Sequence, residues 1–118
     1  MPDETGKIYR VEVTATAREA ILQQARYIAI DQRSPQNAAE WLDRIWTLVD
    51  GLEYLPKRHV VAQGYEQLPY VVRRVLVDNH FILFTIDDTK AIVYIVGLRH
   101  GASLADPAAL PTAISDPR

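Results

Sequence analysis

The chain has 118 residues, of which 48% are hydrophobic and 24% charged, a composition typical of a single soluble globular domain. It has no cysteine, which excludes disulfides and cysteine-ligated metal sites. No uncharged apolar run approaches the roughly 18 residues of a membrane span, and the polar start, Met1–Lys7, is unlike a signal peptide. We therefore expect a cytoplasmic protein with no membrane association.

The net charge of −2 is unevenly distributed. Residues 1–56 carry six basic and nine acidic side chains, whereas residues 57–100 carry six basic and four acidic ones and all three histidines. Any anion-binding surface should therefore belong to the second half of the chain. The excess is small, because domains that act on nucleic acid are usually far more basic.

The start of the chain predicts a strand followed by a helix. Residues 8–13 alternate between apolar and polar and are rich in β-branched side chains, which predicts a strand. Thr16 and Glu19 then match a capping box, with the threonine as N-cap. This signal starts a helix over about residues 17–31.

A second helix follows after a short connection. Ser34 and Pro35 provide the start signal, an N-cap followed by proline at the first helical position. An apolar stripe at helical spacing carries the helix to about Tyr54, and Pro56 ends it. Because the connection is short, we expect an antiparallel helical hairpin.

The hydrophobic period changes in the second half, which predicts three strands: Tyr70–Val77, His80–Ile86 and Ala91–Leu98. Turn-forming residues separate them, which predicts an antiparallel meander. His80 is interpreted as a turn residue. The fold class is then α+β with the order β-α-α-β-β-β, a helical hairpin packed on an antiparallel sheet.

The chain ends in a segment without periodicity. Residues 105–118 contain Pro107, Pro111 and Pro117 among small side chains. We expect a single domain over residues 1–104 and a tail over residues 105–118 that is flexible or loosely docked.

The predicted meander is apolar on both faces, although an antiparallel sheet with one wet face should alternate cleanly. One helical hairpin covers only one face, so the other needs a second cover. The loop over residues 57–69 together with the tail is one candidate, and a partner protein is the other. For a partner, the predicted contact residues are Phe81, Leu83, Tyr94 and Val96.

The element order and several stretches of sequence resemble a known family. The proline that closes the second helix, the strand over residues 73–77, the strand "HFILFTID" and the ending Ile95–Gly101 are all similar to RelE/ParE toxins. A strand that ends in His-Gly, as His100 and Gly101 do here, recurs in ParE-like members. The resemblance covers about residues 8–104.

The resemblance implies the toxin of a type II toxin–antitoxin system, held inactive by a cognate antitoxin and reaching operator DNA only through that antitoxin. ParE-like members poison DNA gyrase, whereas RelE-like members bind the ribosome and cut mRNA. The low charge and the absence of a tyrosine after the last strand favour a gyrase inhibitor that acts by binding and is not an enzyme. Two alternatives stay open: a metal-independent endoribonuclease of the RelE type, and a family member that only binds its partner.

Cleavage of RNA without a metal needs a base for the ribose hydroxyl, a cation for the phosphate and an acid for the leaving oxygen. The candidates are Arg73, Arg74, Arg99 and His100. Strand alternation points Arg73 and Arg74 to opposite faces, and it separates Arg99 from His100 unless the strand has already ended.

The residues expected to contact the target are Lys57, Arg58, His59, Arg99 and His100. Several of the basic residues in this half of the chain also have a plainer interpretation. The three after the second helix would complement its C-terminus, and an arginine on the strand over residues 73–77 would pair with a helix carboxylate. The three histidines lack metal-ligand spacing, so we expect no metal site and no cofactor.

Overall fold

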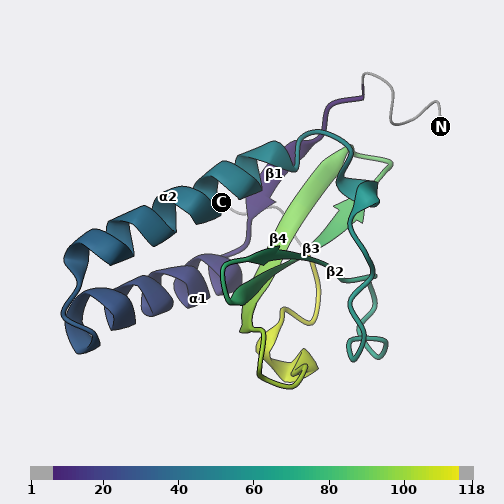
Figure 1. Cartoon of the computed structure of the whole chain (residues 1–118). Coiled ribbons are helices and arrows are strands. Elements are labelled where there is room, and N and C mark those ends of the chain that lie inside the picture. The colour runs from purple at the N-terminus through teal and green to yellow at the C-terminus, as the bar shows by residue number, and fades with distance from the viewer. Residues whose placement is uncertain (1–6, 115–118) are drawn as a thin grey trace.

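The computed structural model describes residues 7–114, in which a helical hairpin packs on one face of a sheet (Figure 1). The elements are β1 (Arg10–Val13), α1 (Ala15–Arg26), α2 (Pro35–Gly51), β2 (Arg73–Val77), β3 (His80–Asp87) and β4 (Ile92–His100). The predicted α+β fold with the order β-α-α-β-β-β is therefore confirmed. No helix in this part of the chain is long and apolar enough to cross a bilayer.

The sheet has the strand order β1-β4-β3-β2. The predicted antiparallel meander is present in β2, β3 and β4, whereas β1 runs parallel to β4 and makes the sheet mixed. The hairpin between β1 and β2 acts as the crossover that lets the first strand join at the far edge. Periodicity identifies a strand but not its neighbour, so the sequence did not specify this pairing.

The start of α1 differs from the predicted capping box. The N-cap is Thr14, whose hydroxyl accepts from the Ala17 N–H at 3.2 Å and donates to the Ile95 carbonyl at 2.8 Å. Thr16 lies inside the helix and is exposed. The correction has a physical reason: Thr14 satisfies a helix N–H and a carbonyl of β4 at once, and a pattern in one segment does not reveal the second bond.

The first helix of the hairpin continues to the predicted end near residue 31, whereas the second helix ends early. α1 ends at Arg26 and continues as a π-helical turn over Tyr27–Asp31. Ser34 occupies the N-cap position of α2 as expected, but its side chain makes no capping bond. α2 ends at Gly51, short of the predicted end, and Leu55 takes a positive φ of 50° before Pro56 opens a short 3-10 helix.

Two apolar clusters flank the sheet. The helix-side cluster includes Ile21, Trp41, Ile45, Ile82 and Phe84. The second cluster lies on the opposite face, here called the tail face, where the loop over residues 57–72 and the tail meet the sheet. Its buried members are Ala62, Tyr65, Val72, Leu83, Ile92, Tyr94, Val96 and Leu110.

The tail face is therefore closed by the chain itself. Leu110 is 6% exposed, and it sits so close to Gly97 that a Cβ there would collide with its side chain. The Tyr70 hydroxyl donates to the Pro111 carbonyl at 2.6 Å. Of the two covers that the sequence left open, the loop and the tail are the ones present. The last four residues of the tail, 115–118, lie outside the described part.

This packing buries three of the four residues that were predicted to contact an antitoxin. Leu83, Tyr94 and Val96 are only 1%, 3% and 0% exposed, while Phe81 is half-buried. A partner reaches the first three only if the loop or the tail moves away. Their contact with an antitoxin stays a prediction, whereas Phe81 lies where a partner can reach it directly.

Candidate functional site

The first group of predicted target-binding residues forms part of the fold. Lys57 lies in the short 3-10 helix Pro56–Arg58 and forms an ion pair with Asp88 at 2.8 Å. Asp88 also accepts from the Tyr9 hydroxyl at 2.7 Å. The hydrogen bond from Lys57, and then that from Tyr9, lowers the pKa of the Asp88 carboxyl. Lys57 thus fastens this loop to the turn between β3 and β4.

Arg73 supports the same loop from β2. Its Nη1 donates to the His59 carbonyl at 2.7 Å and to the Lys57 carbonyl at 3.4 Å. The His59 ring lies edge-on against Phe84, with centroids 5.9 Å apart. Burial, followed by the charges of Arg58 and Arg73, lowers the pKa of His59. The plainer interpretation expected an arginine of this strand to pair with a helix carboxylate. Arg73 instead donates to backbone carbonyls of the loop.

Arg74 and Arg99 are brought together on the tail face. Their guanidinium carbons lie 4.5 and 5.1 Å from the centroid of the Phe81 ring. Arg99 Nη1 donates to the Ser103 carbonyl at 2.7 Å, while its Nε is buried and has no hydrogen-bond partner in the described part of the chain. Register explains the meeting, because Phe81 lies opposite Arg99 on β4, and Arg74 lies opposite Leu83, two residues along β3.

His100 lies on the other face of the sheet, beside the helical hairpin. Its ring meets that of His80 edge-on at a centroid distance of 5.0 Å. The Ala102 N–H donates to His100 Nδ1 at 3.1 Å, so the neutral ring carries its proton on Nε2.

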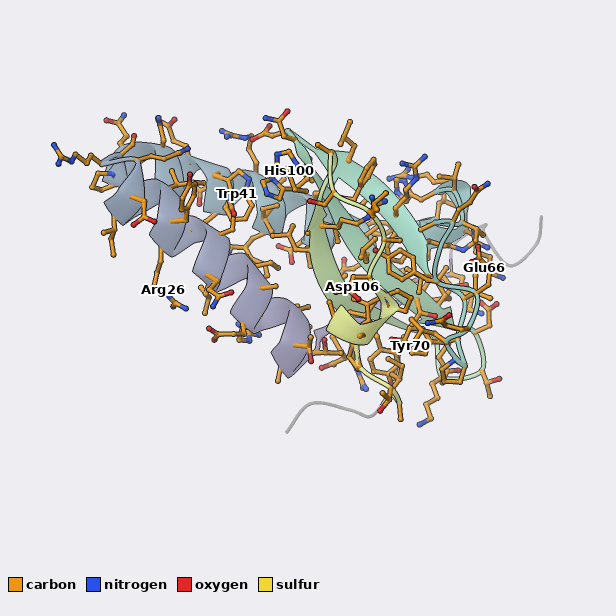
Figure 2. All side chains as sticks on the ribbon, turned by 90° about the horizontal axis from the view of Figure 1, so that it is seen from below. Arg26, Trp41, Glu66, Tyr70, His100 and Asp106 are labelled. Carbon is orange, nitrogen blue, oxygen red and sulfur yellow. The ribbon has the colours of Figure 1, made fainter. Side chains whose placement is uncertain are left out.

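His80 is buried, which corrects its interpretation as a turn residue. It is 8% exposed and meets Trp41 edge-on at 5.7 Å, and Figure 2 shows Trp41 of α2 beside His100. Among residues 7–114, its Nδ1 has no hydrogen-bond partner. The residue was missed because the adjacent turn looked solvent-exposed, and only the tertiary packing of the hairpin buries it.

The two histidines line an open cleft of about 640 Å³ between the hairpin and the turn joining β2 to β3. Arg44 and Asp78 also line the cleft. Arg44 donates through Nε and Nη2 to one oxygen of Asp78 at 3.0 and 2.8 Å. The remaining polar lining is formed by amide and hydroxyl side chains: Gln24, Tyr27, Gln32, Asn37 and Asn79. Sequence reasoning did not find this cleft, because its walls come from four separate segments.

The four predicted catalytic residues are therefore not assembled. Arg74 and Arg99 share the tail face, His100 faces the hairpin, and Arg73 is bonded to the loop. Among residues 7–114 there is also no group of three or more side chains suited to hold a metal ion. Of the four predicted residues, the structure brings only Arg74 and Arg99 together.

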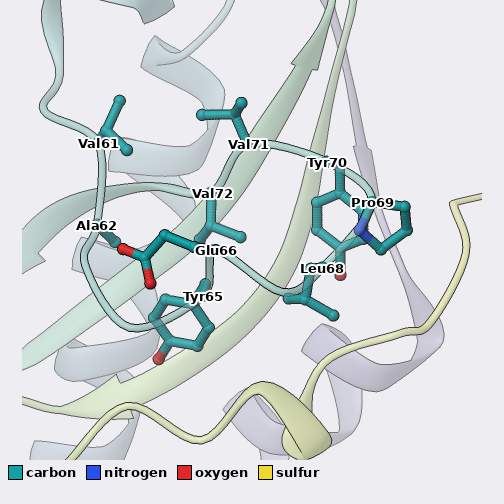
Figure 3. A pocket seen from close by; sticks show the side chains of 9 residues that line it. All are labelled: Val61, Ala62, Tyr65, Glu66, Leu68, Pro69, Tyr70, Val71 and Val72. Carbon is teal, nitrogen blue, oxygen red and sulfur yellow. The ribbon is translucent and has the colours of Figure 1, made fainter.

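A second hollow lies within the loop over residues 61–72 (Figure 3) and has a volume of about 370 Å³. Its walls are mainly apolar side chains, including Val61, Leu68 and Val71. The Glu66 carboxylate accepts from the Gly64 N–H at 3.0 Å, and this bond lowers the pKa of Glu66. The lining of the hollow includes no cationic side chain, and its surface is mainly apolar.

The burial of His80 predicts a pH-dependent stability. Burial, and then the charge of His100, lowers the pKa of His80 below its usual 6.5, outweighing Asp78, which raises it. The unfolded chain thus binds more protons than the folded one below about pH 6.5. The free energy of unfolding is expected to be highest above that pH, where His80 is neutral in both states, and to fall as the pH drops toward about 5. His59 contributes with the same sign.

Chemical denaturation between about pH 5 and pH 8 measures this effect. The matched variant is His80→Phe, which keeps a ring against Trp41 but cannot titrate, and its stability should vary less with pH. Asp88 and Glu66, whose pKa values are lowered, titrate below this window. An identical pH dependence in wild-type and variant protein would contradict the assignment to His80.

Comparison with known proteins places the chain in a family. No curated protein matches it. A family model described as "ParE toxin of type II toxin-antitoxin system, parDE" matches residues 11–105. The chain belongs to this ParE toxin family. The match runs from β1 to the start of the tail, so it includes His59, His80 and His100 and the arginines described above.

Two solved structures share the fold of this ParE family chain. One is the chromosomal ParDE system of P. aeruginosa, with a TM-score of 0.62 and 13% identity, covering 80% of this chain and 98% of that one. The other is the archaeal RelE-RelB complex of Pyrococcus horikoshii, with a TM-score of 0.53 and 15% identity, covering 82% and 99%. At these identities the likeness concerns the fold alone.

Proposed function

We propose that this chain is the toxin of a type II toxin–antitoxin pair, that it inhibits DNA gyrase by binding, and that a cognate antitoxin neutralises it. Membership of the ParE toxin family supports the toxin role. The observation that carries the mode of action is the separation of the predicted catalytic residues onto two faces of the sheet. A cytoplasmic location and indirect contact with operator DNA, through the antitoxin, belong to the same proposal.

The separation argues against ribonuclease chemistry for a specific reason. In-line attack by a ribose hydroxyl needs a base and a phosphate-binding cation within hydrogen-bond reach of one phosphodiester. Arg74 and Arg99 lie together on the tail face. His100, the residue after Arg99, lies on the opposite face of the sheet. His100 Nδ1, the atom that would accept a proton, already accepts from Ala102.

Two assays on the purified chain test the proposal: DNA supercoiling by gyrase and mRNA cleavage on programmed ribosomes. We expect inhibited supercoiling and intact mRNA. Cleavage with supercoiling untouched would reverse the assignment in favour of the RelE-like alternative. Inactivity in both assays would favour a family member that only binds its partner.

The partner is tested independently of the target. We expect the product of the reading frame next to the gene for this chain to copurify with it and to restore growth when both are produced together. The partner is expected to be a small protein that is acidic overall or carries a DNA-binding fold at one end. Normal growth of cells that produce the chain without the product of the neighbouring reading frame would contradict the toxin role.

Replacing the exposed histidine separates the two activities. For a binding inhibitor, His100→Ala is expected to weaken gyrase inhibition by about tenfold, which corresponds to 1.4 kcal/mol of binding. For a ribonuclease that uses His100 as acid or base, the same change would remove about a hundredfold or more of the cleavage rate. His100→Gln is the matched variant, since it keeps a donor without a titratable ring and should retain more of the inhibition.

A further inference from the structure

A mixed cationic and apolar surface on the tail face has no part in the fold's own ion pairs. We call it the arginine patch, and it consists of Val60, Arg74, Leu76, Phe81 and Arg99. Val60 and Leu76 are 57% and 58% exposed. The bridge between Val61 and Arg73 places Val60 on the same side as Arg74, because neighbouring residues alternate across a sheet.

The two arginines of the patch lack a carboxylate partner within residues 7–114. The ion pairs of that part of the chain use other cations, such as Arg44 with Asp78 and Lys57 with Asp88. Arg74 and Arg99 instead hold their like charges against one phenyl ring. An anion placed beside that ring would be attracted by both, so the patch is complementary to negative charge.

Beside the patch, the outward backbone groups of Leu76 on β2 make no hydrogen bond to another strand within residues 7–114. The Arg74 N–H points away from β3 and donates to the Val60 carbonyl at 3.0 Å. Because backbone groups alternate in direction along a strand, the Leu76 N–H and carbonyl point to the same outer edge of β2 as those of Arg74. The loop segment at Val60 and Val61, which pairs with Arg74 and Arg73, does not extend as far as Leu76. Edge groups of this kind accept an added strand. The opposite edge, β1, differs, because Arg10 and Glu12 there pair with each other at 2.7 Å.

We propose that the arginine patch docks an extended, acidic segment of a partner protein. A carboxylate of the segment lies beside Phe81 within reach of Arg74 and Arg99, its backbone pairs with Leu76, and its apolar side chains cover Leu76 and Val60. This inference rests on the proposed function, in which the partner is the antitoxin. It names the chemistry that the antitoxin brings to this surface.

A protein segment fits the patch better than a nucleic acid. Single-stranded nucleic acid binds to basic grooves in which aromatic rings are open for base stacking. Here the Phe81 ring is already in contact with two guanidinium groups, and a Cβ at Gly101 would come within 3.7 Å of it. The exposed Val60 and Leu76 add apolar surface that a phosphate backbone would leave uncovered.

The test uses three defined probes titrated into the full chain. The first is a capped peptide, Thr-Val-Glu-Leu-Glu-Val-Thr, which carries two carboxylates in an extended alternating pattern. The second replaces both glutamates with glutamine, and the third is a ten-nucleotide oligouridylate. NMR chemical shifts of the backbone amides report both affinity and location.

We expect the acidic peptide to bind at least about tenfold more tightly than its glutamine version, the effect of one charge-assisted hydrogen bond. The shifts should centre on Leu76 and Arg99. Equal binding of the two peptides, no binding by either, or shifts elsewhere would overturn the proposal. Preference for the oligouridylate at the same residues would assign the patch to nucleic acid.

Variants localise the effect. Arg74→Gln and Arg99→Gln should each remove most of the preference for the acidic peptide, whereas Arg33→Gln, which deletes the same charge in the hairpin turn, should not. Leu76→Pro removes one outward N–H at a strand edge and should weaken both peptides equally. Circular dichroism and thermal unfolding show whether each variant is folded, and Leu76→Thr keeps the N–H where the proline variant does not fold.

The peptide test and the antitoxin test fail separately. If no antitoxin copurifies but the acidic peptide binds at the patch, the proposed function falls and the docking surface stands. If the antitoxin copurifies equally with wild-type, Arg74→Gln and Arg99→Gln chains, the proposed function stands and this inference falls.

Discussion

Removing residues 105–118 is expected to lower the free energy of unfolding by about 3–5 kcal/mol, because the tail closes an apolar face of the sheet. The truncation deletes Leu110 from a cluster in which Leu83, Tyr94 and Val96 are almost fully buried. It also deletes the carbonyl of Pro111, to which the Tyr70 hydroxyl donates. Urea denaturation of the shortened and full chains measures the difference.

A pair of leucine substitutions provides the control. Leu110→Ala should cost about 2–3 kcal/mol, whereas Leu104→Ala should be nearly neutral, within about 0.5 kcal/mol. The two leucines are 6% and 91% exposed, so the same chemical change is made in a core and on a surface. If the truncated chain were as stable as the full one, the tail would not be the cover, and the face would be available to a partner.

The amphipathic and alternating segments were predictable from the sequence because their physics is local. The helix-side core follows from helical stripes such as Ile21 and Ile45, and the meander follows from β-rich runs between turn residues. The sequence also showed that both faces of the sheet are apolar, and this correctly predicted that a second segment must cover the face opposite the helices. Which segment supplies that cover depends on packing between distant parts of the chain.

The candidate sites were less predictable because they depend on tertiary register. Alternation correctly separated Arg73 from Arg74 and Arg99 from His100. It did not reveal that Arg74 and Arg99 meet across β3 on Phe81, because this needs the pairing of three strands. The burial of His80 against Trp41 likewise needs the angle of the hairpin to the sheet, which no local pattern contains.

The N-cap of α1 shows the same limit in a form that can be measured. Thr14 and Thr16 are both threonines near a helix start, and the sequence pattern favoured Thr16 because Glu19 lies three residues later. The structure assigns the cap to Thr14, which is 8% exposed, whereas Thr16 is exposed. The buried threonine has two partners, one in its own helix and one in β4.

Thr14→Val is therefore expected to destabilise the chain by about 2–3 kcal/mol, and Thr16→Val by less than about 0.5 kcal/mol. Valine has nearly the shape of threonine, so the first change removes the cap to the Ala17 N–H and leaves the Ile95 carbonyl without the hydroxyl that donates to it. The effect should appear both in the urea midpoint and in faster amide exchange of the first turn of α1. Equal losses from the two variants would return the cap to the capping box at Thr16. A loss at Thr14 alone would show that the hairpin is fixed to β4 at the N-cap of α1.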